Sequence, residues 1–188
     1  KFSCIFSRAD IDLSVNVANF PYLSLPIISA NMDTITETKM AKTMIMNGAM
    51  ACLHRFSTID YNVDDFKKSY LWASGVGVRT PFVSIGLGEL EFKRAEALYD
   101  AGARVFVIDV ANGASTRVVE QALDLRYKYG DSISIIVGNF ATGESVERFL
   151  AYHTSVDGFK VGIGPGSLCT TRIKTGVGMP QLSAIMDV

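Results

Sequence analysis

The feature that most restricts the fold of this chain is a regular alternation of short apolar runs with longer amphipathic segments. Each run is rich in Val, Ile, Phe or Ala and ends in small or polar residues, as strands do. The segments between them repeat apolar residues every three or four positions, which is typical of helices. Nearly continuous apolar strands joined by single helices indicate a parallel sheet covered by helices. The expected strands span residues 25–30, 49–54, 81–86, 104–109, 134–139 and 158–163.

Capping residues mark where the intervening helices should begin. Thr34 and Glu37 have the spacing of a capping box, in which each side chain bonds a free backbone N–H of the first turn. Thr58, Ser115 and Thr142 stand directly before amphipathic segments and suit the N-cap position. The sequence therefore predicts helix starts at Thr34, Thr58, Ser115 and Thr142.

Two α/β architectures fit this alternation, a doubly wound open sheet and a (β/α)8 TIM barrel. An open dinucleotide-binding sheet carries a glycine fingerprint after its first strand, and here residues 31–37 contain no glycine. Most strands instead end in candidate polar groups, which a barrel gathers at its catalytic face. We therefore favour the barrel. The polar groups are Asn31, Asp33, His54, Arg55, Asp109, Asn112 and Asn139.

The predicted barrel is incomplete. Six strands are found where eight are needed, and the chain has 188 residues where a barrel typically has about 250. The helix that starts near Pro180 stops at Val188, and residues 1–6 and 69–80 fit the pattern poorly. We expect residues 1–188 to form a single catalytic barrel domain with about six βα units, truncated or with missing segments.

Composition excludes several other classes of protein. With 48% hydrophobic residues and a formal net charge of −1, the chain is typical of a globular protein and has no basic stripe for nucleic acid. No apolar run is long enough for a membrane helix and the start lacks a signal peptide, so we expect a cytoplasmic protein. Three cysteines, Cys4, Cys52 and Cys169, form neither a disulfide framework nor a zinc pattern.

Cys169 is the strongest candidate for a reactive residue. A free cysteine is commonly a small buried hydrophobe, and we assign that role to Cys4 and Cys52. Cys169 instead follows a glycine-rich loop and precedes Arg172 and Lys174, whose positive charges favour the nucleophilic thiolate. The glycines could form only a tight turn, or their carbonyl groups could hold a monovalent cation.

The remaining candidates have structural alternatives. His54, at the end of an expected strand, is equally suited to binding and to a structural role, and His153 is expected on the surface. Asp33 and Asp109 could each do no more than cap the following turn. Residue chemistry alone thus leaves the substrate undefined.

Four motifs together resemble the IMP dehydrogenase/GMP reductase family of (β/α)8 barrels. They are ANMDT (30–34), IDVANG (108–113), GN followed by TGE (138–144), and KVGIGPGSLCTTRIKTGVGMPQLSAI (160–185). The resemblance extends from about Ser7 to the end of the chain, and the last motif is highly specific. It implies that Cys169 attacks carbon 2 of the purine to form a covalent thioimidate, and that Thr171 helps to transfer protons to the departing amine.

The resemblance also implies ligand sites around this loop. A potassium ion would be surrounded by Gly164, Gly166, Cys169 and Arg172, and the nucleotide, GMP or IMP, by Asn31, Met32 and Asp33. The phosphate-binding loops and a catalytic glutamate of the reductases belong to later segments than this chain contains. The implied contacts to NADPH are Ser7, Arg8, Arg55, Asp109, Val110, Ala111, Ile163 and Gly164.

The local wording is similar to the reductase branch of the family. DVANG and KTGVGMPQ are close to reductase motifs, and reductases expel ammonia from GMP and reduce the intermediate with NADPH. The alternatives are the dehydrogenase branch, which oxidises IMP with NAD, and a noncatalytic nucleotide-binding barrel fragment. The resemblance further implies a homotetramer.

Overall fold

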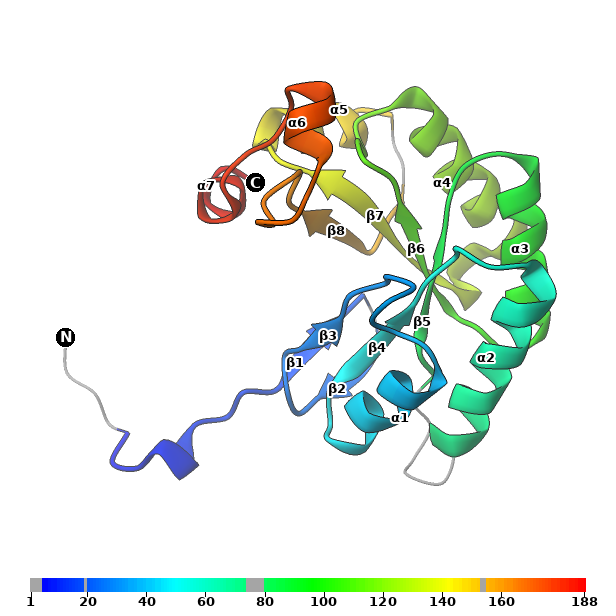
Figure 1. Cartoon of the computed structure of the whole chain (residues 1–188), viewed down its shortest axis with the longest axis vertical. Coiled ribbons are helices and arrows are strands. Elements are labelled where there is room, and N and C mark those ends of the chain that lie inside the picture. Colours follow the sequence, from blue (N-terminus) through cyan, green and yellow to red (C-terminus); the bar gives the residue numbers. More distant parts are fainter. Residues whose placement is uncertain (1–4, 19, 74–79, 153–154) are drawn as a thin grey trace.

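The computed structural model describes residues 5–18, 20–73, 80–152 and 155–188, and its centre is a six-stranded parallel sheet (Figure 1). The spatial order of the strands, β3-β4-β5-β6-β7-β8, is also their order along the chain. All six expected strands are confirmed. They are β3 (Ile28–Ser29), β4 (Met50–Leu53), β5 (Phe82–Ile85), β6 (Val105–Asp109), β7 (Ser134–Phe140) and β8 (Gly158–Val161).

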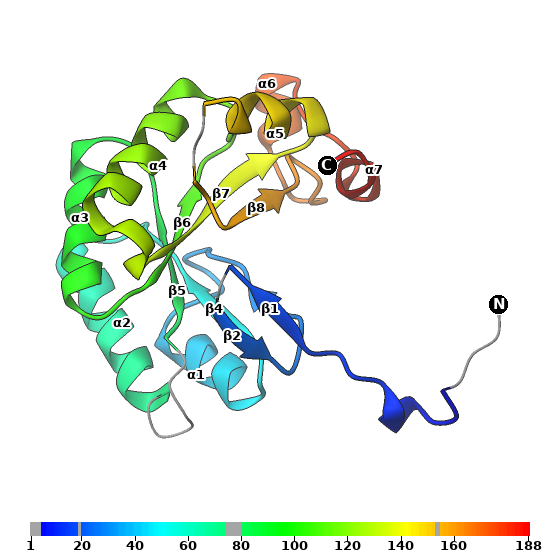
Figure 2. The same ribbon diagram turned by 180° about the vertical axis from the view of Figure 1, so that it is seen from behind.

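Helices follow the strands and lie along the convex side of the curved sheet, as both views show (Figures 1 and 2). The sheet bends through about half of a barrel and leaves β3 and β8 as open edges. This half-barrel confirms the predicted incomplete TIM barrel. The covering helices are α1 (Thr38–Met46), α2 (Ile59–Ala73), α3 (Glu89–Asp100), α4 (Thr116–Tyr129) and α5 (Gly143–Leu150); a short 3-10 turn, η3 (Gly130–Ser132), follows α4.

The two faces of the sheet pack against different partners because side chains alternate along each strand. On the convex face, Phe106, Ile108 and Val137 pack with helix residues such as Leu98 and Leu125 into the main core. On the concave face, Met50, Cys52, Phe82, Val105 and Ile136 belong to a second, smaller buried cluster. The side chains of this second cluster therefore fill part of the concave interior of the half-barrel.

An antiparallel hairpin packs against this concave cluster and was not expected from the sequence. Its strands are β1 (Val15–Val17) and β2 (Phe20–Leu23), with Val15 paired to Leu23. Leu23 is buried in the concave cluster, and Val15, Val17 and Ala18 pack against it. Each of the two strands is too short to show the alternation of apolar and polar residues that marks a strand in a sequence. The hairpin is therefore recognised only from its packing against the sheet.

The predicted helix starts have mixed outcomes. The Thr58 and Thr142 hydroxyls accept from the backbone N–H groups of Tyr61 and Ser145 at 3.2 and 3.3 Å, so both caps are confirmed. Ser115 is the N-cap of α4, but its side chain makes no capping bond.

The predicted start at Thr34 is wrong, because α1 begins four residues later, with Glu37 at its N-cap and no capping bond from that side chain. A carboxylate from the neighbouring helix replaces the local cap. Asp65 of α2 accepts the backbone N–H of Thr38 at 2.8 Å and also bonds the Thr38 hydroxyl. A tertiary contact has therefore set the start of this helix, which local spacing could not indicate.

The segment that leads into β1 and the helices that follow β8 lie on opposite sides of the opening of the half-barrel (Figure 1). An extended arm with one turn, η1 (Arg8–Asp10), leads into β1, whereas α6 (Thr171–Thr175) and α7 (Gln181–Asp187) follow β8. The α7 carboxylate of Asp187 accepts the backbone N–H of Gly143 at 3.0 Å and so joins α7 to the start of α5.

Three expectations about single residues meet different outcomes. Cys52 is buried as expected, and burial raises the pKa of its thiol to about 12, so it is an inert core residue. Cys4 and His153 lie outside the described residues. Within the described part of the chain, none of the helices combines the length and apolar character needed to cross a membrane.

Candidate functional site

The site is organised by the loop that leaves β8, whose backbone needs glycine. Gly164 has φ +63°, a conformation that side chains rarely adopt, and a Cβ there would lie 3.1 Å from Cγ of Arg172. Gly162 also has a positive φ, +130°. Gly166 is different, because its φ is ordinary and the atom nearest to an added Cβ is Cys169 Cβ at 3.6 Å. Two of the three glycines are therefore required by the turn itself.

This loop forms the wall of a cavity of about 360 Å³ at the carboxyl ends of the strands. Cys169 and Thr171 line it, as do Lys160 on β8 and Asn139 on β7. The other lining residues are Met32, Ala111, Val161, Gly162, Ile163, Gly164, Pro165 and Gln181. The cavity therefore joins the cysteine to polar side chains from two neighbouring strands, as an active site of a barrel requires.

The environment of the Cys169 thiol is set by its neighbour Thr171. Its Sγ lies 3.3 Å from the Thr171 hydroxyl oxygen, and the side chain is half-buried. As a thiol, the sulfur donates to the Thr171 hydroxyl oxygen; as a thiolate, it accepts from the Thr171 hydroxyl. This side-chain hydrogen bond, then the hydrogen bond with the Thr171 backbone, then the positive charge of Arg172 lower the pKa of the Cys169 thiol. The thiolate is the nucleophilic form, so these contacts increase its fraction at neutral pH.

Arg172 holds the two sides of the cysteine loop together. Its Nη1 donates to the carbonyl oxygen of Gly164, and its Nη2 donates to that of Gly166 at 3.3 Å. These neutral carbonyl oxygens are suitable ligands for a monovalent cation such as potassium. A guanidinium has no acceptor atom, so Arg172 could contribute to a cation site only through its backbone carbonyl. The carbonyl groups fit such an ion, and here they accept from Arg172.

Behind the cysteine, a polar network crosses the concave face at the carboxyl ends of the strands. Lys160 Nζ lies 2.7 Å from Asp109 Oδ1 and 3.0 Å from Asn139 Oδ1. The buried Asn31 side chain donates to Asp109 Oδ2 at 2.8 Å. Asp109 therefore has a partner for each oxygen and does not act merely as a cap for its turn. The network places one fixed cation and one fixed carboxylate at the base of the cavity.

The expected site residues are only partly brought together. Six of them, including Cys169, line the cavity. Asn31 and Asp109 belong to the polar network behind the cysteine. Val110 contributes backbone bonds to β7, donating to Gly138 at 3.0 Å and accepting from Asn139 at 2.9 Å. The six lining residues are Met32, Ala111, Ile163, Gly164, Cys169 and Thr171.

Four expected residues lie elsewhere in this chain. Asp33 is exposed and lines a different cavity, together with Glu37 and Lys39. Arg55 stands at the end of β4 with its guanidinium carbon 4.9 Å from the centre of the Phe56 ring, and its Nε is buried without a partner. Ser7 and Arg8 lie on the arm, which extends away from the body (Figure 1). The structure does not bring these four to Cys169.

Lys160 and Gln181 are cavity residues that sequence reasoning missed. Lys160 interrupts an otherwise apolar strand, and the alternation of side chains along strands places it on the same face of the sheet as Asp109. This lone lysine was the sequence signal that could have identified it as a site residue. Gln181 begins α7, and its Nε2 donates to the carbonyl oxygen of Val161 at 3.0 Å. No local pattern marks Gln181, because its partner is a carbonyl group on the open edge of β8.

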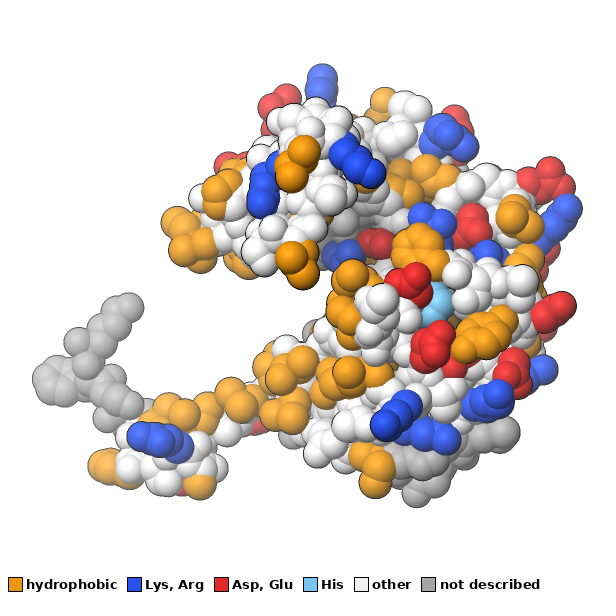
Figure 3. All heavy atoms as spheres, in the orientation of Figure 1, with side chains coloured by type: hydrophobic (Ala, Val, Ile, Leu, Met, Phe, Trp, Pro, Cys, Tyr) orange, Lys and Arg blue, Asp and Glu red, His pale blue; other side chains and the backbone are white. Residues whose placement is uncertain are grey.

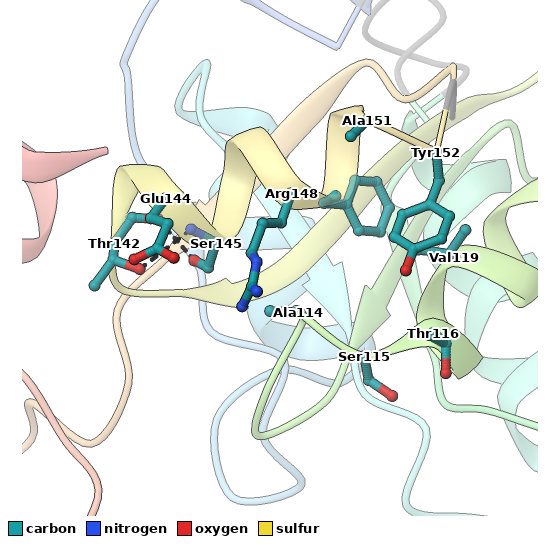
Figure 4. Close-up of a pocket in the computed structure, with 11 residues that line it drawn as sticks. Ala114, Ser115, Thr116, Val119, Thr142, Glu144, Ser145, Arg148, Ala151 and Tyr152 are labelled. Carbon is teal, nitrogen blue, oxygen red and sulfur yellow. Dashed lines mark hydrogen bonds between the residues drawn. The ribbon is translucent and has the colours of Figure 1, made fainter.

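A larger cavity of about 600 Å³ lies between the beginning of α4 and the length of α5 (Figure 4). Arg148 and Tyr152 of the α5 segment extend along it, and Ser115 and Thr116 border it from α4. Its lining includes none of the expected catalytic, substrate or cofactor residues. The smaller cavity at Cys169 is therefore the candidate active site.

Comparison with known proteins identifies relatives over the whole chain. Residues 2–188 match the model of the IMP dehydrogenase / GMP reductase domain. GMP reductase from Buchnera aphidicola is 36% identical, and GMP reductase 2 from Bos taurus is 37% identical; each match covers 100% of this chain and 53% of the relative. The crystal structure of inosine 5'-monophosphate dehydrogenase from Legionella pneumophila superposes with a TM-score of 0.85 at 42% identity.

That structural match covers 100% of this chain and 55% of the Legionella chain. The chain therefore spans about half the length of the proteins that it matches. This proportion agrees with a half-barrel that has two open edges.

Proposed function

Because this chain belongs to the IMP dehydrogenase/GMP reductase family, we propose that the protein is a GMP reductase, which converts GMP to IMP and ammonia with NADPH. The observation that carries the proposal is Cys169, with its lowered pKa, beside Thr171 on a strand-end cavity. An oxidoreductase of purine nucleotide metabolism follows from the family and its curated reductases. The choice of branch rests on the DVANG and KTGVGMPQ wording.

In the proposed reaction, the Cys169 thiolate attacks carbon 2 of the guanine base. A carbon–sulfur bond forms as the carbon–nitrogen bond breaks, and the amine leaves as ammonia after taking up protons. The Thr171 hydroxyl is within hydrogen-bond distance of the sulfur that attacks carbon 2. It would therefore lie close enough to the amine on that carbon to pass a proton to it. When bound, NADPH would supply the hydride for carbon 2 and become NADP, and release of the Cys169 thiolate would then leave IMP.

The polar network provides positions for the base and the cofactor. Lys160 and Asn139 face the cavity, and Asp109 fixes the lysine from behind. We propose that Asn31 and Met32 bound the nucleotide side, and that Asp109, Val110, Ala111, Ile163 and Gly164 bound the NADPH side. Asp33, Ser7, Arg8 and Arg55 remain predicted ligand contacts that depend on parts of the assembly beyond this cavity.

A potassium ion would be held by backbone carbonyl groups of the cysteine loop. Gly164 and Gly166 already direct their carbonyl oxygens toward a positive charge, and Cys169 and Arg172 complete the proposed set. The ion would order the loop that presents the thiolate. We further propose a single barrel domain in a cytoplasmic homotetramer, in line with the family resemblance and the exposed apolar residues of this chain.

An IMP dehydrogenase is the second candidate. The observation that favours it is the 42% identity to the Legionella dehydrogenase, compared with 36 to 37% for two of the reductases. Both branches use the same cysteine chemistry, so the site geometry suits either reaction. They differ in the nucleotide and cofactor that are consumed.

Parallel assays of the full-length protein distinguish the two. One mixture contains GMP and NADPH and the other IMP and NAD, each with the Cys169→Ala variant as the blank. We expect NADPH loss and ammonia release in equal amounts in the first mixture only. Turnover confined to IMP and NAD, with xanthosine monophosphate as product, would instead identify a dehydrogenase.

A further inference from the structure

Two hydrogen bonds join the chain segments on either side of the cysteine loop, residues 164–178. The backbone N–H of Met179, after the loop, donates to the carbonyl oxygen of Ile163, before it, at 3.0 Å. Nε2 of Gln181 donates to the carbonyl oxygen of Val161, also at 3.0 Å. We call these two bonds the loop clamp. They place the two ends of the loop side by side, so the nucleophile lies on a closed loop.

The loop clamp uses carbonyl groups on the open edge of the sheet. The N–H of Gly162 donates to Phe140 of β7 at 2.7 Å. Because backbone groups alternate in direction along extended chain, the carbonyl groups of Val161 and Ile163 face away from β7. In the described part of the chain, β8 is the last strand of the sheet on that side. Gln181 therefore satisfies a carbonyl group that pairing within the sheet leaves free.

The carboxamide of Gln181 is held between a glycine and an anchored helix. Gly162 has φ +130°, and a Cβ there would lie 3.1 Å from Gln181 Cδ and closer still to Oε1. On α7, which begins at Gln181, Ala184 is fully buried and Asp187 accepts the N–H of Gly143 at 3.0 Å. The side chain that closes the loop is thus fixed by packing at both of its ends.

We propose that Gln181 is a positioning residue for Cys169, because its carboxamide holds the end of β8 against the segment that follows the loop and so fixes where the sulfur lies in the cavity. The inference rests on the proposed function in treating Cys169 as the nucleophile. Both residues line the same cavity. A displacement of about 1 Å between reacting atoms can slow a reaction by about a hundredfold, so the loop clamp should matter for turnover.

Two variants remove the donor while keeping the length of the side chain. Gln181→Met has no N–H to give to Val161, and Gln181→Glu, when ionised, places another acceptor against that carbonyl group. We expect the glutamate variant to be the more severely affected. If only the shape of the side chain mattered, both variants would match the wild type. Ser183→Ala, at an exposed position of the same helix, is the control.

Steady-state kinetics and hydrogen exchange of the full-length protein test the proposal together. In Gln181→Met we expect kcat with GMP and NADPH to fall by about tenfold to a hundredfold, and the KM for GMP to change less than about threefold. The Met179 amide should exchange about twofold to tenfold faster, the range for losing one neutral hydrogen bond from the loop clamp. Alkylation of Cys169 by iodoacetamide should stay within about twofold, since Thr171, the first cause of its lowered pKa, lies inside the loop.

Four results would overturn the proposal. They are a normal kcat in both variants, faster exchange of Met179 with an unchanged kcat, a fall in kcat without faster exchange, and equal losses in Ser183→Ala. A misfolded variant is recognised by fast exchange in β6 and β7, and the other variant then supplies the comparison. If the wild type turns over IMP and NAD instead of GMP and NADPH, kcat is compared with those substrates, and the proposed function fails while this inference stands.

Discussion

At the scale of single residues, the arrangement of Cys169 and Thr171 leads to two predictions about chemistry. The sulfur and the hydroxyl oxygen are 3.3 Å apart, and both face the cavity that also contains Lys160. Cys52 provides a natural comparison, because burial raises its pKa and excludes it from reaction. The two cysteines thus show how environment, rather than residue type, decides reactivity.

Replacing Cys169 with alanine should abolish turnover while nucleotide binding is retained. The thiolate provides a covalent route rather than most of the ground-state contacts, so we expect kcat to fall by more than about a thousandfold and the Kd for GMP to change less than about threefold. Steady-state assays and calorimetry measure the two quantities. Cys52→Ala is the matched control and should keep its activity. Near-normal turnover of Cys169→Ala would rule out the covalent mechanism.

Replacing Thr171 with alanine should raise the pKa of Cys169 and slow loss of the amine more than hydride transfer. The Thr171 bond is the first cause of the lowered pKa, and without it more of the thiol stays protonated at a given pH. The pH profile of Cys169 alkylation, followed by peptide mass, should therefore move to higher pH. Single-turnover kinetics should show deamination slowed by about a hundredfold. Thr170→Ala is the control, and an unchanged profile in Thr171→Ala would contradict this role.

At the scale of elements, the pairing of β7 with β8 places Lys160 and Asn139 side by side in the site. The two strands approach closely at Gly138. An added Cβ there would lie 3.0 Å from the backbone oxygen of Lys160 and 2.6 Å from its Cβ. This glycine therefore permits the register that brings the lysine to Asp109.

Gly138→Ala should destabilise the fold and displace Lys160. We expect a loss of about 1 to 3 kcal/mol in the free energy of unfolding, since strand backbone cannot move aside as a flexible side chain can. Urea denaturation measures the loss. The control is Gly158→Ala on β8, where the nearest atom to an added Cβ is Ile136 Cγ1 at 3.5 Å. A cost no greater than that of the control would show that the strand pair adapts easily.

At the scale of the whole molecule, the half-barrel leaves two sheet edges and several apolar side chains in contact with solvent. Unpaired backbone groups on an edge strand are a template for pairing with another chain. Ile27 and Ile28 on one side of the opening are 54% and 41% exposed, and Leu182 and Met186 on the other are 71% and 78% exposed. The opening between these sides is visible in Figure 3.

Residues 1–188 produced as a separate polypeptide should therefore self-associate and show no turnover. We expect light scattering with size-exclusion chromatography to report a mass above 20.4 kDa. A polypeptide of the length of the relatives, which is about twice that of this chain, should be active under the same conditions. A monodisperse, active monomer of residues 1–188 would contradict both the exposed-edge argument and the proposed dependence on later segments.

Local patterns of residues were enough to predict the order of strands and helices and the candidate nucleophile. All six strands of the parallel sheet were predicted, because each is a short apolar run whose local pattern suffices to identify it. The family was likewise evident from contiguous motifs around Cys169. The backbone of this loop requires glycine at 162 and 164, and that requirement is visible directly in the local sequence. Thr58 and Thr142 were predicted as caps for the same local reason.

Which distant residues contact one another became clear from the folded structure alone. Asp65 caps the backbone N–H of Thr38, where α1 begins. The hairpin of β1 and β2 was recognisable only from its packing against the concave cluster. Lys160 of β8 contacts Asp109 of β6, with β7 between the two strands. The same level separated Asp33, Arg55, Ser7 and Arg8 from the cavity. Periodicity and capping act over a few residues, whereas these contacts join segments far apart in the chain, so their energies depend on how the folded sheet and its helices bring those segments together.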